Sequence, residues 1–123
     1  MAHGYTEAAW DGQKKEVARM RQVIEGKVYN TETATLLHEW QNGREYGDFR
    51  YRSKALYRSP KGAYFLLHDG GAMTDMARAT GENSWTGSSA IEVISQHDAM
   101  RFLESHGGSD VLIREFADQI EEG

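Results

Sequence analysis

The sequence contains no cysteine and a single proline among its 123 residues. The lack of cysteine excludes disulfides, thiolate metal sites and thiol nucleophiles, and it fits a reducing compartment, so we expect a cytoplasmic protein. No apolar run approaches the roughly 20 residues that a membrane span needs. The first ten residues also lack the basic start and apolar stretch of a signal peptide.

Apolar residues make up 39% of the chain, and they include three Trp, six Tyr and four Phe. That content is enough for a hydrophobic core, and the length is typical of one domain. We therefore expect a single domain over residues 1–123, with an N-terminal helical extension at 1–22 and a core domain at 23–122. The predicted fold class is α+β: an antiparallel sheet of about four or five strands with helices packed on one face.

The clearest element is a hairpin of residues 49–58 and 63–68 across the turn 59–62. Aromatic and basic side chains alternate with period two in its first strand, so one face should be apolar and the other basic. Pro60 and Gly62 supply turn chemistry. The buried side should carry Phe49, Tyr51 and Tyr57, and the exposed side Arg50, Arg52 and Arg58.

Other segments in the first half give weaker signals. Residues 6–22 have the spacing of an amphipathic helix. Residues 23–29 resemble two short strands around a Glu-Gly turn. Residues 33–40 fit a strand, with a helix from Thr31 as the rival interpretation.

In the second half, residues 72–79 suggest a short helix, 82–88 a loop and 89–94 a strand. Ser95 has the position of an N-cap for a helix that ends at Gly107 and Gly108. Ser109 should cap a last helix. The docking face of that last helix should carry Leu112, Ile113, Phe116 and Ile120.

Several short phrases occur together in this chain, at residues 28–34, 48–51, 55–58, 62–66, 70–74 and 85–87. As a set they resemble a family of short hypothetical proteins from bacterial genomes, phages and other mobile elements. The resemblance covers about residues 23–122 and brings no activity with it. It implies only a setting, because small proteins of mobile elements often act on host defence or nucleic-acid machinery.

Charge is distributed unevenly along the chain. The net charge is -5, yet residues 44–61 hold six basic and two acidic side chains. A row of cations on a strand could follow a phosphate backbone or an acidic protein groove. The alternative is a solvated face paired with the protein's own acidic helices. The candidate partner-binding residues here are Arg50, Arg52, Lys54, Arg58 and Lys61.

The remaining candidates carry weaker signals. Trp85 is either an exposed anchor for a partner or, as we favour, a loop plug into the core. No two histidines have metal-ligand spacing, although His38 and His68 could lie on neighbouring strands. Asp69-Gly70-Gly71 could cradle an anion if a helix follows it. We therefore assign no catalytic, cofactor or metal residue.

The function that fits these observations is a non-enzymatic binding protein of a phage or mobile element that occupies a surface of a host macromolecule. An inhibitor of a bacterial defence complex, such as an anti-CRISPR protein, is a specific version. The alternative is a nucleic-acid-binding accessory protein that uses the basic strand 50–58. A small hydrolase or transferase is the third possibility.

Overall fold

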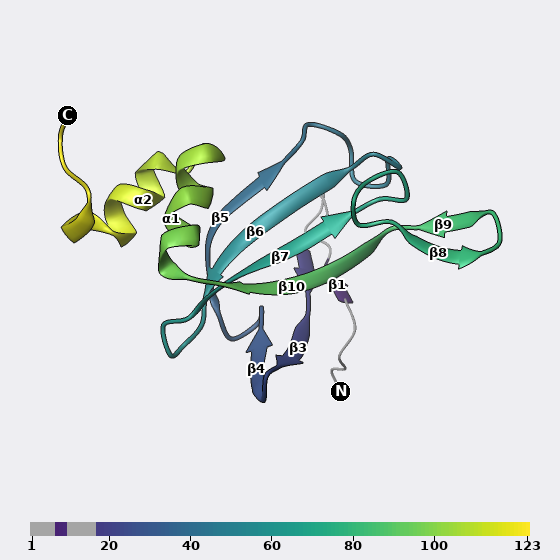
Figure 1. Ribbon diagram of the computed structural model, residues 1–123, viewed down its shortest axis with the longest axis horizontal. Coiled ribbons are helices and arrows are strands. Elements are labelled where there is room, and N and C mark those ends of the chain that lie inside the picture. Colours follow the sequence, from purple (N-terminus) through teal and green to yellow (C-terminus); the bar gives the residue numbers. More distant parts are fainter. Residues whose placement is uncertain (1–6, 10–16) are drawn as a thin grey trace.

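The computed structural model describes residues 7–9 and 17–123. Its main sheet has four antiparallel strands in the order β10-β7-β6-β5 (Figure 1). These strands are β5 (Thr35–Gln41), β6 (Arg52–Arg58), β7 (Tyr64–Gly70) and β10 (Ser88–Ile94). The helices are α1 (Gln96–Ser105), α2 (Ser109–Glu115) and the short 3-10 helix η1 (Ala117–Gln119). The α+β fold with one main antiparallel sheet is therefore confirmed.

Three two-stranded antiparallel pairs accompany this sheet. They are β1 (Glu7–Ala9) with β2 (Val17–Arg19), β3 (Arg21–Ile24) with β4 (Lys27–Asn30), and β8 (Arg78–Gly81) with β9 (Ser84–Thr86). The two strands around the Glu-Gly turn are thus confirmed, and 35–41 is a strand. The helix expected at 6–22 falls partly on residues outside the described part of the chain. Where the structure describes that segment it is strand, because pairing between strands prevails over a weak helical periodicity.

The predicted central hairpin is present as β6 and β7, in register from Arg58 opposite Tyr64 to Arg52 opposite Gly70. Its turn closes with the Gly62 amide donating to the Ser59 carbonyl at 2.9 Å, and Gly62 takes a φ of +91°. The first strand begins at Arg52 and not at residue 49. The Asp48 carboxylate accepts the Arg50 amide at 2.7 Å and holds residues 48–51 in a turn. The expected burial of Phe49 is therefore wrong: its side chain is 66% exposed.

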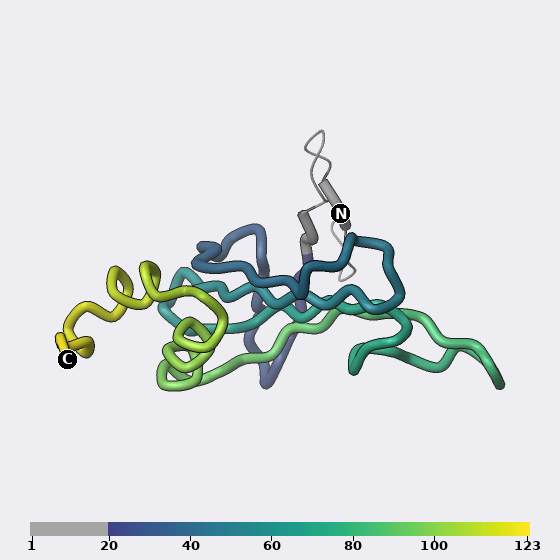
Figure 2. Tube along the Cα trace, turned by 90° about the horizontal axis from the view of Figure 1, so that it is seen from above, coloured from purple at the N-terminus to yellow at the C-terminus, as the bar shows by residue number. Residues whose placement is uncertain are grey.

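Both faces of the sheet are buried, by different elements. Leu56 and Leu66 pack against the helices, and the core on that face is completed by Ala99, Phe102, Leu103, Leu112 and Phe116. The alternate residues of β6 and β7 pack against the β3–β4 hairpin in a second core, which contains Tyr29, Ala55, Tyr57, Phe65, Leu67 and Ile91. The helices lie at one end of the sheet, as Figure 2 also shows. This double burial explains why three consecutive residues are buried in the middle of each central strand.

The helix termini follow the sequence signals in part. The Ser95 hydroxyl accepts the Asp98 amide at 3.0 Å, which confirms the N-cap of α1. Gly107 takes a φ of +77° and the Gly108 amide donates to Leu103 O at 2.8 Å, a Schellman ending. The N-cap of α2 is Gly108 and not Ser109. Ile113 is 56% exposed, so its place on the docking face is wrong, whereas Leu112, Phe116 and Ile120 do pack in the helix-side core.

Two further expectations are corrected between β7 and β10. Residues 72–79 do not form a helix, because the Thr74 hydroxyl donates to Gly71 O and accepts the Met76 amide, which favours a turn. Residues 82–88 do not form a simple loop, because they contain β9 and the turn of the β8–β9 hairpin. Within the described residues, no helix is long and apolar enough to cross a membrane.

Candidate protein-binding surfaces

The basic row of β6 is divided in two by the helices. Arg52, Lys54 and Arg58 share one face of the strand with Leu56, as the period of a strand requires. Leu56 is fully buried in the helix-side core. Arg58 therefore lies on one side of the covered region, and Arg52 and Lys54 lie on the other. The row does not form one continuous surface.

Arg52 is held by His68 on the neighbouring strand and by Asp75 in the loop after β7. Its Nε lies 2.6 Å from the Asp75 carboxylate, and its Nη2 lies 2.9 Å from His68 Nδ1. The Arg52 side chain is only 12% exposed. The hydrogen bond from Arg52 holds the pKa of Asp75 below its usual range. Arg52 thus joins β6 to the loop after β7.

Arg58 joins the sheet to α2. Its guanidinium forms an ion pair with Glu115, whose side chain is 13% exposed, and the Tyr64 hydroxyl donates to the same carboxylate at 3.1 Å. The hydrogen bond to Glu115 raises the pKa of Arg58, and burial followed by the hydrogen bond to Glu115 raises that of Tyr64. This pairing matches the alternative in which the basic face meets the protein's own acidic helices.

The other three cations of the set lie in more open places. Arg50 Nε is 3.8 Å from the Asp48 carboxylate, and the Lys54 ammonium sits 5.9 Å from the centre of the Trp40 ring. Lys61 is exposed in the turn between β6 and β7. Partner binding by this set stays a prediction, and its most accessible members are Arg50 and Lys61.

The two histidines that could have met on neighbouring strands, His38 and His68, do not come together. His38 is on β5 and His68 on β7, with β6 between them. His38 Nε2 lies 2.8 Å from His106 O, and His68 Nε2 lies 2.7 Å from Glu92 Oε1. Among the residues that the structure describes, no group of three or more His, Asp or Glu side chains could hold a metal ion.

The glycines after Asp69 serve close packing of the chain. A Cβ on Gly71 would lie 2.5 Å from Phe49 O, and one on Gly87 would lie 2.1 Å from Gly70 O. Gly70 ends β7, and no helix follows it. The anion-cradle interpretation is therefore wrong, and these glycines fix the base of the β8–β9 hairpin against the loop that contains Phe49.

The β8–β9 hairpin projects from the end of the sheet that lies away from the helices (Figure 1). Every residue of both strands is exposed, and Trp85 is 60% exposed. The loop-plug interpretation of Trp85 is therefore wrong. An exposed Trp on a projecting hairpin fits the anchor interpretation, because Trp is enriched at the centres of protein interfaces.

Three other exposed apolar side chains belong to loops at the same end. Met73 and Phe49 are neighbours, since the Met73 amide donates to Phe49 O at 2.8 Å, and Tyr46 stacks edge-on against buried Tyr51. With Trp85 they form what we call the distal surface: Tyr46, Phe49, Met73 and Trp85. The exposed loop residues were not predictable from sequence, because Phe49 has the period of a core residue and Met73 falls in the segment expected to be a helix.

The chain matches no family model, no curated protein and no solved structure. The resemblance to proteins of mobile elements therefore stays a prediction.

Proposed function

We propose that this chain is a non-enzymatic binding protein that docks on a folded protein partner through the distal surface. The observation that carries the proposal is the β8–β9 hairpin, whose side chains are all exposed. Trp85 therefore adds little to the core, while its burial against a partner would remove a large apolar area from water.

Phe49 and Met73 strengthen the proposal. Both are exposed, and both sit on loops fixed by backbone hydrogen bonds and by tight glycine contacts. A loop backbone that is already ordered loses little conformational entropy on binding, which favours affinity.

The alternative of nucleic-acid binding has less support. Arg52 and Arg58 already bind carboxylates of the same chain, and the net charge of -5 would repel a polyanion away from the basic strand. A host protein or nucleoprotein complex is the partner class that we favour. Origin in a mobile element and inhibition of a defence complex are narrower versions of the same proposal.

The test is affinity capture from the native host with the full chain, followed by quantitative mass spectrometry, with and without nuclease. Trp85→Ala should lose the captured complex. Ile113→Ala removes an equally exposed apolar side chain at the helical end, and it should retain the complex. Full recovery by Trp85→Ala would contradict the distal surface as the site.

If the captured complex is lost on nuclease treatment, that result would favour the alternative function, nucleic-acid binding through the basic strand. The matching variant is Arg50→Ala with Lys61→Ala, because these side chains are exposed and contribute little to stability. Changing Arg52 or Arg58 would break the ion pair with Asp75 or Glu115. A loss of binding could then result from a loss of stability.

A further inference from the structure

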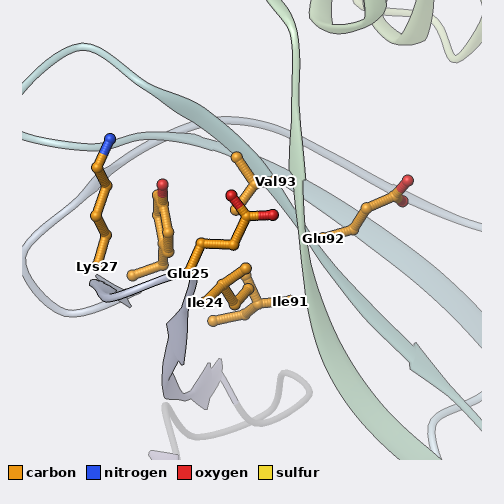
Figure 3. Close-up of a pocket in the computed structure, with 7 residues that line it drawn as sticks. Ile24, Glu25, Lys27, Ile91, Glu92 and Val93 are labelled. Atoms are coloured by element: carbon orange, nitrogen blue, oxygen red, sulfur yellow. The ribbon is translucent and has the colours of Figure 1, made fainter.

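A groove of about 420 Å³ lies between the β3–β4 turn and strand β10 (Figure 3). Ile24, Ile91 and Val93 give it an apolar wall, and the polar residues that line it are Glu25, Lys27, Tyr29 and Glu92. Figure 3 shows the Glu25 carboxylate directed across the groove toward Val93, whereas the Glu92 carboxylate points to the other side of β10. Glu92 contacts His68 there.

Glu25 occupies a position that disfavours its residue type. It has a φ of 51° and Gly26 has a φ of 79°, so the two-residue connection of β3 to β4 is a type I′ turn. Asn, Asp and Gly are the residues favoured at its first position, because they tolerate positive φ. Glu25 is the one non-glycine residue with positive φ in the described part of the chain.

The edge of β10 is open beside this groove. The Gly71 amide donates a hydrogen bond to Tyr51 O. In β7 the backbone N–H and C=O groups of odd-numbered residues therefore point toward β6, and those of even-numbered residues point toward β10. The backbone groups of Ile91 and Val93 therefore point away from the sheet. Gln22 accepts the Ile91 amide at 3.3 Å, and within the described residues nothing bonds the outward amide of Val93.

We propose that this groove binds an extended peptide by its arginine side chain. The peptide backbone would pair with the outward N–H and C=O of Val93, as in β-strand addition. The methylene stem of the arginine would pack on Ile24 and Val93, and its guanidinium would bind the Glu25 carboxylate. Lys27 stands on the opposite side of the groove from Val93, so its ammonium does not compete for that position (Figure 3).

The probe is the capped tripeptide acetyl-Val-Arg-Val-amide, titrated into the 15N-labelled full chain and followed by amide chemical shifts. Shift changes should centre on Glu25, Lys27 and Val93. Glu25→Gln should weaken binding about three- to fivefold, which is the scale of a partly exposed charge pair. Glu32→Gln, an exposed carboxylate in the turn after β4, should leave binding unchanged.

Two further probes separate the parts of the proposal. The same tripeptide with citrulline in place of arginine keeps the shape and loses the charge. It should therefore bind to the wild type as weakly as the arginine tripeptide binds to the Glu25→Gln variant. Acetyl-arginine-amide lacks the flanking residues and should bind more weakly than the tripeptide. Equal binding of the citrulline peptide, equal binding of acetyl-arginine-amide, or no shift change at the groove would each overturn the proposal.

Discussion

Replacing Glu25 by Asn should stabilise the protein. A residue with a full side chain in the left-handed region costs about 1–2 kcal/mol, and Asn recovers part of that cost. The Glu25 side chain is exposed at a turn, so the substitution removes no core packing. We expect the free energy of unfolding to rise by about 0.5–1 kcal/mol. For a chain of 123 residues this corresponds to a melting temperature about 2–4 °C higher.

The assay is thermal unfolding followed by circular dichroism, with urea unfolding to measure the free energy directly. Glu25→Gln is the matched control, because it removes the charge and keeps the unfavourable side chain at positive φ. Its stability should stay within about 0.5 kcal/mol of the wild type. An equal gain in both variants would show that charge and not backbone conformation determines the effect. No gain in Glu25→Asn would refute the strain argument itself.

Four other substitutions test the helical end. Phe116→Ala should lower the free energy of unfolding by about 3–5 kcal/mol, while exposed Ile113→Ala should change it by less than about 0.5 kcal/mol, both measured by urea unfolding. Glu115→Gln should cost about 1–3 kcal/mol because it leaves Arg58 without its carboxylate; a change near zero in thermal unfolding would contradict a structural ion pair. Burial lowers the pKa of His106, so the unfolded chain binds the proton more tightly and stability should fall as pH drops below about 6.5. His106→Gln should remove that part of the decline between pH 7.5 and 5.5, and an unchanged pH profile of the melting temperature would refute it.

The parts of the fold that were predictable from sequence are those that local chemistry determines. Pro60 and Gly62 predicted the central turn. The alternation of side-chain types on either side of the turn predicted the strands β6 and β7. Ser95 predicted the start of α1, where it is the N-cap, and Gly107 predicted its end, where it takes a positive φ. Each of these signals acts within about six residues, where neither topology nor distant packing can override it.

The parts that sequence reasoning missed depend on contacts between distant segments. Phe49 has the period of a core residue, but the strand that would bury it begins three residues later. The partner of Arg58 is Glu115, 57 positions away, and nothing local indicates it. Trp85 was expected to fill the core because an exposed Trp without a use favours aggregation. The hairpin that exposes it was not predictable, since a three-residue strand carries too little periodicity.

Burial of both sheet faces determines where a partner can bind. The helices cover one end of the first face and the β3–β4 hairpin covers the second. Exposed apolar side chains gather at the distal end, and Val93 on β10 is also partly accessible. Strand β10 links these places, since it runs from Ser88 beside the distal hairpin to Ile94 beside α1. Its seven residues span roughly 20 Å.

The open edge of β10 is interrupted midway, because the Gln22 side chain accepts the outward amide of Ile91. One added strand therefore could not pair along the full length of β10. The distal surface and the β10 groove should therefore act as two independent sites, with a folded partner suited to the first and a short extended segment to the second.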